Sequence, residues 1–541
     1  YSYDYTTVKG EKWYDPRTSN GEDENGEVVK RIREYKKMVW SNTLSYLTTF
    51  NNIHHLDFLA GYEIDDTYND YLSGEAYNFT TPDKHAISNG MKTVSVGGSD
   101  SRYRLVSYLS RLNYDYKNKY YLGASFRVDG SSRLHRDNRW GTFWSVSGAW
   151  RTIEEEFMQP VKDWLTDLRI RASYGVNGTL PSDYFGYMGL SSISGGYLEQ
   201  PGIQMSQIAN PNLKWETNYN MNIGLDFGFW DRLNFTIEYY TRTTKNLLMD
   251  CPVSMTTGFS SYLMNIGEVK NKGIELTINS TNIKIKDFSW NTTFNLGHNS
   301  NKVVKLDGEQ TQIVSGTQIH KVGSSYRTFY VQEFAGINPE TGNPLFYTNE
   351  LDENGNYIKE ITENSKNAQF IPYKHAEPTV NGGISNSLRY KWLDLNFLFS
   401  YQFGGYSYDT WAQKTEHGGY DSYANIPTYY RDSWKKPGDQ TNIEVYMPGK
   451  SSSVSMHKIT SSRRIHSTDY FRLKNITFGI TLPKEWTNKI NIGNVRFYAS
   501  ASNLWTWAAY DNYDPEAVSA GSATQTTPPL KTVTFGLNIN F

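Results

Sequence analysis

The residues best suited to bind a ligand are aromatic rings clustered between positions 406 and 434. Aromatic faces stack on sugars and on peptide side chains, and Tyr and Trp add a polar group for hydrogen bonding. We therefore predict a substrate-binding loop with the candidate contacts Tyr406, Tyr408, Trp411, Tyr429, Tyr430 and Trp434, and with Tyr420 and Tyr423 in the same stretch. The alternative is that these rings pack the loop itself or a partner protein.

A second candidate is a calcium site on Asp352, Asn354 and Asn356, whose side-chain oxygens alternate as calcium ligands do. Gly355 falls at the fourth position of this segment, whereas an EF-hand loop has its Gly at the sixth. Asn-Gly between strands is also a common hairpin turn, which is the competing interpretation. Residues 23–26 repeat the pattern.

The sequence offers no constellation for catalysis or for zinc. Its ten His residues include no HExxH pair, and the adjacent His54 and His55 would point to opposite faces of a strand. The carboxylates at 154–156 have no nucleophile nearby, so we expect them to be solvated rather than to act in acid–base chemistry. We predict no catalytic residues, no cofactor and no enzyme activity.

Composition excludes two further classes of protein. Aromatic residues make up 15% of the 541 positions, but no apolar run approaches the roughly 20 residues of a membrane helix. The net charge of −2 provides no basic surface for nucleic acid, and the single Cys251 cannot form an internal disulfide. The chain starts at Tyr1 without signal-peptide features, so we expect a processed chain or a fragment.

Strict alternation of apolar and polar residues recurs along the chain and predicts β-strands with one face in an apolar medium. Val533, Phe535, Leu537 and Ile539 alternate with polar residues or Gly in this way. The stretches 168–174, 222–229, 234–239 and 393–400 follow the same rule, with their charges on the polar side. Alternation alone fits a soluble sandwich as well as a barrel, so the connections must decide.

About fifteen such segments are joined by connections that alternate between short and long. The short ones are 51–52, 116–119, 230–232, 282–287, 390–391 and 483–491. The long ones are 67–101, 178–213, 301–376, 408–465 and 508–529, and residues 1–35 are expected in another long loop. This asymmetry is typical of outer-membrane barrels, so we predict an all-β, transmembrane antiparallel β-barrel with long extracellular loops.

Aromatic placement agrees with this prediction, because Tyr and Trp favour the two membrane interfaces. The aromatic residues at short turns are Tyr120, Tyr121, Trp230, Trp392 and Trp486. Those where strands approach long loops are Tyr239, Tyr240, Trp505 and Trp507.

One strand breaks the alternation. Its apolar set shifts by one position after Leu473. We predict a β-bulge there, or a position above the bilayer for Arg472 and Lys474, since a cation at the midplane costs about 2–4 kcal/mol.

Charged residues on the polar faces of the strands carry both signs. We expect ion pairs that rigidify the wall, with direct substrate guidance as the alternative. The residues concerned are Arg127, Arg169, Arg171, Asp226, Glu238, Glu275 and Arg496.

Several sequence motifs occur in a fixed order. Near the end stand DYFRLKNITFG at 469–479, ASNLWTW at 501–507, YDPE at 513–516 and TFGLNINF at 534–541. Further upstream are RVDGSSR at 127–133, LKWE at 213–216, NIGLD at 222–226, NKGIEL at 271–276 and GINPETG at 336–342. From about Tyr103 onward this set resembles the SusC/RagA family of TonB-dependent outer-membrane transporters.

The resemblance implies import of a nutrient, a glycan or peptide oligomer, across the outer membrane with a SusD-like surface lipoprotein and TonB. It also implies a barrel of about 22 strands closed by an N-terminal plug. No plug or TonB-binding segment is recognisable, so we expect residues 1–541 to be a partial barrel without its plug and first strands. A passive porin or structural barrel remains the alternative, and a full-length N-terminus would distinguish the two.

Overall fold

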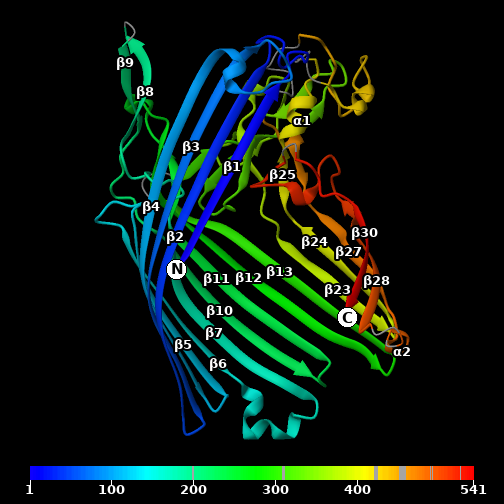
Figure 1. Ribbon diagram of the computed structural model, residues 1–541. Coiled ribbons are helices and arrows are strands. Elements are labelled where there is room, and N and C mark those ends of the chain that lie inside the picture. Colours follow the sequence, from blue (N-terminus) through cyan, green and yellow to red (C-terminus); the bar gives the residue numbers. More distant parts are fainter. Residues whose placement is uncertain are drawn as a thin grey trace. The chain divides into compact units, whose positions relative to one another are not determined.

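The computed structural model describes residues 1–197, 200–306, 311–419, 425–449, 459–487, 489, 492–523 and 526–540. Tyr420, Tyr423 and Phe541 lie outside the described residues. β-Strands dominate the fold, as predicted (Figure 1). Within these ranges, no helix has the length and apolar character needed to cross a membrane.

Hydrogen bonding among the described residues places sixteen strands in one antiparallel order that follows the sequence, apart from the strands that lie in loops. They are β1 (Ser2–Tyr14), β2 (Glu27–Phe50), β3 (His54–Phe79), β4 (Gly90–Tyr116), β5 (Tyr120–Ser131), β6 (Trp140–Trp150), β7 (Leu165–Thr179), β10 (Glu216–Phe229), β11 (Leu233–Pro252), β12 (Ser261–Ile285), β13 (Phe288–Leu306), β23 (Val380–Tyr390), β24 (Leu393–Phe403), β27 (Tyr470–Thr481), β28 (Asn494–Ala508) and β30 (Thr532–Asn540). Such a meander is what short hairpin connections produce.

The chain divides into two compact units, the first made of residues 1–149, 173–220 and 244–266. Its strands β1 to β4 lie side by side as long ribbons (Figure 1). Strands β2 to β4 have 24, 26 and 27 residues, whereas a membrane span uses only about 9–11. Much of each strand therefore extends beyond any bilayer. The connection from β7 to β10 carries the hairpin of β8 (Leu190–Tyr197) and β9 (Gln200–Gln207).

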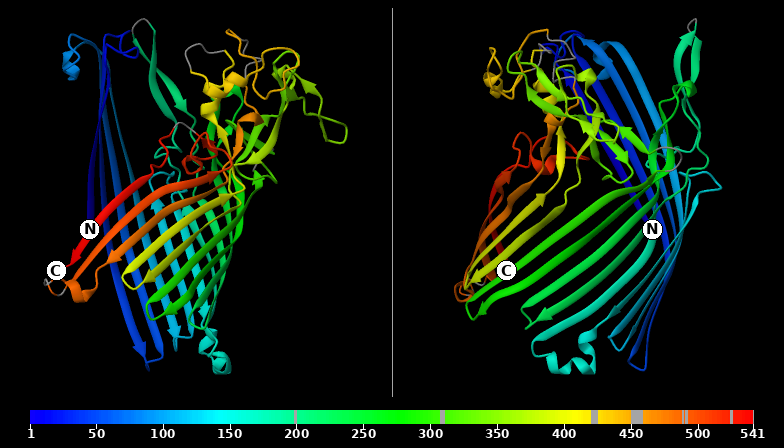
Figure 2. Two further views of the ribbon diagram at one scale, coloured as in Figure 1. Left: turned by 90° about the vertical axis from the view of Figure 1, so that its right-hand side faces the viewer. Right: turned by 180° about the vertical axis from the view of Figure 1, so that it is seen from behind.

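The second unit comprises residues 150–172, 221–243 and 267–541. Strands β13, β23, β24, β27, β28 and β30 pair consecutively within it, and Figure 2 shows β23, β24, β27 and β28 side by side. Its long connections form small sheets: β14 (Gln312–Ser315), β15 (Gln318–Lys321), β16 (Thr328–Gln332) and β22 (Phe370–His375); β17 (Phe334–Ile337), β18 (Pro344–Tyr347) and β21 (Ile361–Thr362); β19 (Glu350–Leu351) and β20 (Tyr357–Ile358); and β25 (Tyr406–Asp409), β26 (Ile465–Ser467) and β29 (Ser522–Ala523). The α-helices are α1 (Thr410–Thr415) and α2 (Lys484–Thr487).

Two predicted loops are wrong. The long loop expected at 67–101 is mostly strand, because β3 continues to Phe79 and β4 begins at Gly90. The loop expected at 1–35 contains β1 and the first part of β2. Where both faces of a strand meet water, nothing selects alternation, so these Tyr- and Asp-rich stretches look like loops in the sequence.

The short turns are where the sequence placed them. Asn51 and Asn52 join β2 to β3 with φ of 53° and 57°, and Trp230 and Asp231 join β10 to β11 with φ of 51° and 54°. Two successive left-handed residues make the type I′ geometry that suits the twist of a hairpin.

The predicted β-bulge is confirmed at Lys474. Along β24, Leu398 pairs with Asn475 and the next residue, Phe399, pairs with Leu473, so Lys474 is left out of the register. The pairing of β27 with β28 also shifts between Leu473 and Asn475. The extra residue lets Phe471 and Leu473 share a face with Ile476.

Candidate functional site

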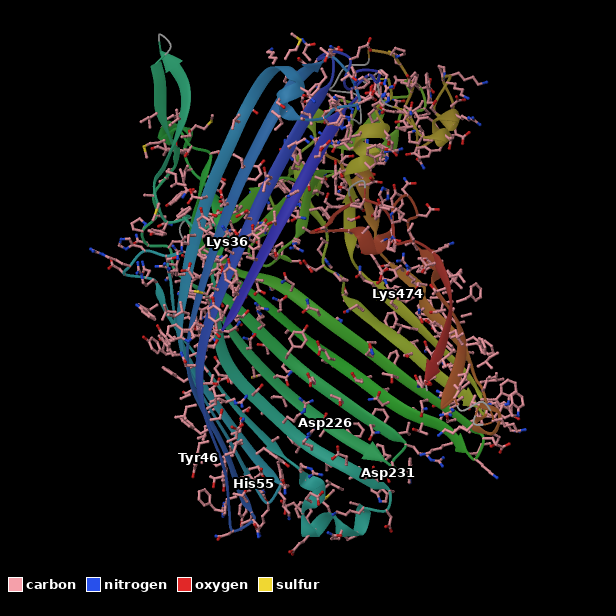
Figure 3. The ribbon with its side chains drawn as sticks, in the orientation of Figure 1. Lys36, Tyr46, His55, Asp226, Asp231 and Lys474 are labelled. Atoms are coloured by element: carbon pink, nitrogen blue, oxygen red, sulfur yellow. The ribbon has the colours of Figure 1, made fainter. Side chains whose placement is uncertain are left out.

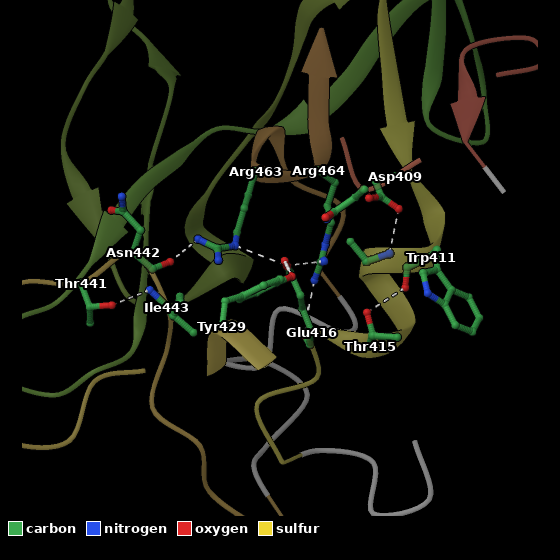
Figure 4. Close-up of polar contacts among 12 residues, drawn as sticks. Asp409, Trp411, Thr415, Glu416, Tyr429, Thr441, Asn442, Ile443, Arg463 and Arg464 are labelled. Atoms are coloured by element: carbon green, nitrogen blue, oxygen red, sulfur yellow. Dashed lines mark hydrogen bonds and ion pairs between the residues drawn. The ribbon is translucent and has the colours of Figure 1, made fainter. Parts of the chain in front are cut away.

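The predicted aromatic loop follows β24 and is built from β25, α1, the 3-10 helix Thr428–Asp432 and β26 (Figure 4). Asp409 ends β25 and begins α1, because its carboxylate Oδ1 accepts a hydrogen bond of 2.8 Å from the Ala412 N–H. This N-cap fixes the direction of the short helix and of the side chains on it.

Two of the six candidate rings are buried in the protein itself. Tyr408 is 1% exposed and packs with Phe329, Val331 and Ile465, and Tyr430 is 5% exposed. Neither ring offers a face to a ligand, so for these two the packing alternative holds. The sequence pattern did not identify these buried rings, because residues that pack inside a loop do not recur at a regular spacing.

Tyr406 and Tyr429 are partly buried and carry polar contacts. The Lys374 ammonium lies 5.3 Å from the centroid of the Tyr406 ring. The Tyr429 hydroxyl donates to the Glu416 carboxylate.

Trp434 is held by the GINPETG motif. Its indole N–H donates to the Pro339 carbonyl at 2.7 Å. Gly342 lies under the ring with φ of 72°, and a Cβ at this position would stand 2.5 Å from the indole, so only glycine fits. Asn338, Thr341 and Asn343 all donate to the Glu363 carboxylate, which closes the turn.

Trp411 is the most accessible of the six rings, with 42% of its surface exposed. It lies on α1, where its backbone carbonyl accepts a hydrogen bond of 3.3 Å from the Thr415 hydroxyl. Trp411 therefore presents a solvent-facing indole on a capped helix.

Behind this helix lies a buried charge cluster that the sequence did not predict. Arg464 is fully buried, and its Nη1 lies 2.5 Å from Glu416 Oε2, while Arg463 Nε lies 3.5 Å from the same oxygen. Burial alone would raise the pKa of Glu416, but the positive charge of Arg464 and then of Arg463 outweighs it, so the pKa is lowered. Glu416 is thus held ionised against two guanidinium groups.

Residues from the 509–523 connection complete the cluster. The His466 and Tyr510 rings stack with centroids 3.7 Å apart, and the Tyr510 hydroxyl donates to Asp409 Oδ2 at 3.0 Å. Burial lowers the pKa of His466, so the ring tends to stay neutral. Asp409 therefore caps α1 with one oxygen and binds Tyr510 with the other.

The calcium candidates lie in the turn from β19 to β20, where Asp352 Oδ1 accepts the N–H groups of Asn354 and Asn356 at 2.9 and 2.7 Å. The Asn356 side-chain amide also donates to Asp352 Oδ2. These bonds, that from the Asn356 backbone foremost, lower the pKa of Asp352. The carboxylate thus organises a hairpin turn, and the described residues contain no group of three or more His, Cys, Asp or Glu side chains that could hold a metal ion.

The predicted wall charges form ion pairs. Asp226 accepts from Arg169 at 2.9 Å and Arg171 at 2.8 Å, and Arg171 also reaches Glu238 at 2.5 Å. Arg496 pairs with Asp394 at 2.7 Å, and Arg127 pairs with Asp129 at 2.7 Å. The expected ion pairs are therefore present at these residues, and their effect on the rigidity of the wall stays a prediction.

The carboxylates at 154–156 also have local partners. Glu154 pairs with Arg151 and Lys162, and Glu155 accepts from the Trp150 indole at 3.0 Å. His54 and His55 contact different partners, Tyr114 and Thr49.

Comparison with known proteins agrees with the fold. Residues 1–357 match the family model described as TonB dependent receptor-like, beta-barrel. TonB-dependent receptor P3 of Formosa agariphila is 32% identical over 95% of this chain and 53% of its own length. TonB-dependent receptor SusC of Bacteroides thetaiotaomicron is 29% identical over 96% of this chain and 51% of its own length.

A solved structure, that of the RagAB peptide transporter, matches all of this chain and 59% of its own with a TM-score of 0.87 and 26% identity. The chain spans about half the length of the curated relatives it matches. The motif resemblance is thereby confirmed, and the chain belongs to the TonB-dependent receptor β-barrel family, as a SusC/RagA-type barrel of the outer membrane.

Proposed function

We propose that the whole protein imports a nutrient oligomer, a glycan or a peptide, across the outer membrane in a TonB-dependent way. A SusD-like surface lipoprotein would deliver the substrate, and a plug carried outside this sequence would couple release to TonB. Trp411, together with the partly buried Tyr406, Tyr429 and Trp434, would contact the substrate, while Tyr408 and Tyr430 hold the loop in place.

The observation that carries this proposal is an exposed indole on a fixed helix. A stacking ring contributes most to binding affinity when its rotamer and backbone are already fixed before binding, because less conformational entropy is then lost. The N-cap at Asp409 and the buried Glu416–Arg464 pair supply that order around Trp411. The likeness to SusC and to RagAB supports an oligomeric substrate and a lipoprotein partner.

The first test is mass spectrometry of the native complex, extracted in detergent from outer membranes. We expect a full-length chain with a plug and a co-purifying SusD-like lipoprotein. A barrel that emerges alone and conducts ions freely in planar bilayers would support the passive-pore alternative instead.

Substrate contact is tested by Trp411→Ala in the full-length receptor, with uptake measured on a panel of glycan and peptide oligomers. Loss of one stacked ring should lower affinity by about 5- to 10-fold, from roughly 1 kcal/mol of ring contact. Trp486→Ala is the matched control, because Trp486 is also exposed, at 60%, but lies on α2 in a short connection. Equal uptake by both variants and the wild type would contradict a role for Trp411.

A further inference from the structure

The outward face of β2 to β4 changes from apolar below Trp40 to positively charged above it. Residues on one face of neighbouring strands form rungs across the sheet, two residues apart along each strand. Trp40, Ile64 and Val106 form one rung of paired residues. The rungs from here down to the turn at Asn51 carry exposed large side chains on this face, among them Leu44, Tyr46, Phe50, Tyr108 and Leu112.

The length of this apolar stretch matches a bilayer. From Trp40 to Phe50 is about 34 Å of strand at roughly 3.4 Å per residue. A tilt of about 40° reduces that to about 26 Å of height, close to the roughly 25 Å apolar band of outer-membrane barrels. The Trp40 rung therefore marks the upper edge of the hydrocarbon.

The next two rungs carry Lys36, Arg102 and Arg104, together with the carboxylate of Asp66. The first pairs Met38, Asp66 and Arg104, and the second pairs Lys36, Tyr68 and Arg102. Lys36 lies well above Tyr46 on β2 (Figure 3). At about 7 Å per rung on one face, both rungs fall at the level of the lipid headgroups.

The two arginines are held in place yet open to solvent. Asp66 accepts Arg102 Nη2 at 2.5 Å and Arg104 Nε at 2.8 Å. The Asp66 side chain is only 9% exposed, whereas those of Arg102 and Arg104 are 52% and 57% exposed. One buried carboxylate thus fixes two guanidinium groups and leaves a surplus of positive charge facing outward.

Tyrosine rings and carboxylates surround the positively charged residues of these two rungs. Lys36 pairs with Glu34 at 3.0 Å, and its ammonium lies 5.7 and 5.8 Å from the ring centroids of Tyr5 and Tyr68. One rung further out, Glu34 pairs with Asp70, which pairs with Asp100. An anion is therefore favoured beside Arg102 and Arg104 and disfavoured one rung further out.

We propose that Arg102 and Arg104 form a binding site for a phosphate-bearing anionic headgroup of an outer-leaflet lipid. Guanidinium groups bind phosphate oxygens through paired N–H donors, and a partly dry interface strengthens the contact. The site would fix the height of the long strands in the membrane, separately from substrate import.

The test is native mass spectrometry of the full-length receptor with phosphatidylglycerol as the anionic probe and phosphatidylcholine as the zwitterionic one. R102Q/R104Q should lower the preference for phosphatidylglycerol by about fivefold for each guanidinium removed. Asp66→Asn should raise it, by a similar factor, because both guanidinium groups lose their internal partner. The matched control is R31Q/R33Q, which removes the same charge from the opposite face of β2.

The two variants are expected to change the preference for phosphatidylglycerol in opposite directions. Misfolding would lower this preference in both variants, so it can be distinguished from the proposed effect. An unchanged preference in R102Q/R104Q, no rise in Asp66→Asn, or an equal loss in the control would each overturn the proposal. Equal binding of the two lipids by the wild type would overturn it as well.

Discussion

Replacing Glu416 with Gln should loosen the loop that presents Trp411. Arg464 is fully buried, and its Nη1 pairs with Glu416 Oε2 at 2.5 Å. Breaking a buried pair by removing one partner costs about 3–5 kcal/mol, because the remaining charge stays desolvated. Local opening of residues 409–419 should therefore become more frequent by a factor of about 10² to 5 × 10³.

Hydrogen–deuterium exchange of peptides covering 409–419 measures this opening. The matched control is Glu377→Gln, because Glu377 pairs with Arg327 at 3.0 Å but both side chains are about a third exposed. An exposed pair contributes about 0–1 kcal/mol, so exchange there should change little. Exchange of 409–419 that is the same in both variants would refute the reasoning.

The same pair predicts a pH dependence. The pKa of Glu416 is lowered from 4.5 in the folded loop, so its stabilisation is fully present above pH 4.5 and is lost as pH falls through the lowered value. Exchange of 409–419 should therefore rise in acid in the wild type. In Glu416→Gln it should lack this acid-dependent rise.

Three further changes have direct structural expectations. Asp352→Ala should open the β19–β20 turn, which would be measured as faster exchange of 350–358. Calorimetric titration with calcium chloride should give no binding signal in either the wild type or the variant. Gly342→Ala should cost at least about 1–2 kcal/mol for the left-handed backbone alone and shift Trp emission to longer wavelength as Trp434 is displaced. Arg472→Met should free the 509–523 connection for proteolysis, because Arg472 is 2% exposed and pairs with Asp514 and Glu516; cleavage at wild-type rates would contradict this.

The sequence predicted the fold best where one strand face is apolar. Alternation and two-residue turns identified β10, β11, β24 and β30, because lipid selects every second residue. The same reasoning failed for β1 and for the outer halves of β3 and β4, where water reaches both faces. There, strand pairing is maintained by backbone hydrogen bonds and polar side chains, which leave no periodic signal.

The sequence predicted where the candidate site lies in the chain, but not which of its rings are buried and which are exposed. The density of rings between 406 and 434 identified the loop, yet nothing in that density separates the buried Tyr408 from the exposed Trp411. That difference depends on partners distant in sequence, such as Phe329 and Ile465. The adjacent Arg463 and Arg464 were the one local signal of a charge cluster.

The motifs that carried the family resemblance acquire a physical role when their contacts are followed to Trp411. The bulge at Lys474 keeps Lys474 and Arg472 on one face, and both bind Glu516 of the YDPE motif. Fixing that motif anchors the connection at Tyr510, whose hydroxyl binds Asp409, the N-cap of the helix that bears Trp411.

Strand β27 is thus joined to the helix that bears Trp411 through the ion pairs of Glu516, the chain segment 510–516 and the hydrogen bond from Tyr510 to Asp409. The side-chain contacts in this series involve charged groups, and such contacts lose most when a single partner is removed. Arg472→Met should therefore raise exchange in 409–415 as well as in 509–523, although Arg472 is distant in sequence from the helix. Faster exchange confined to 509–523 would show that α1 is held by Asp409 and Glu416 alone.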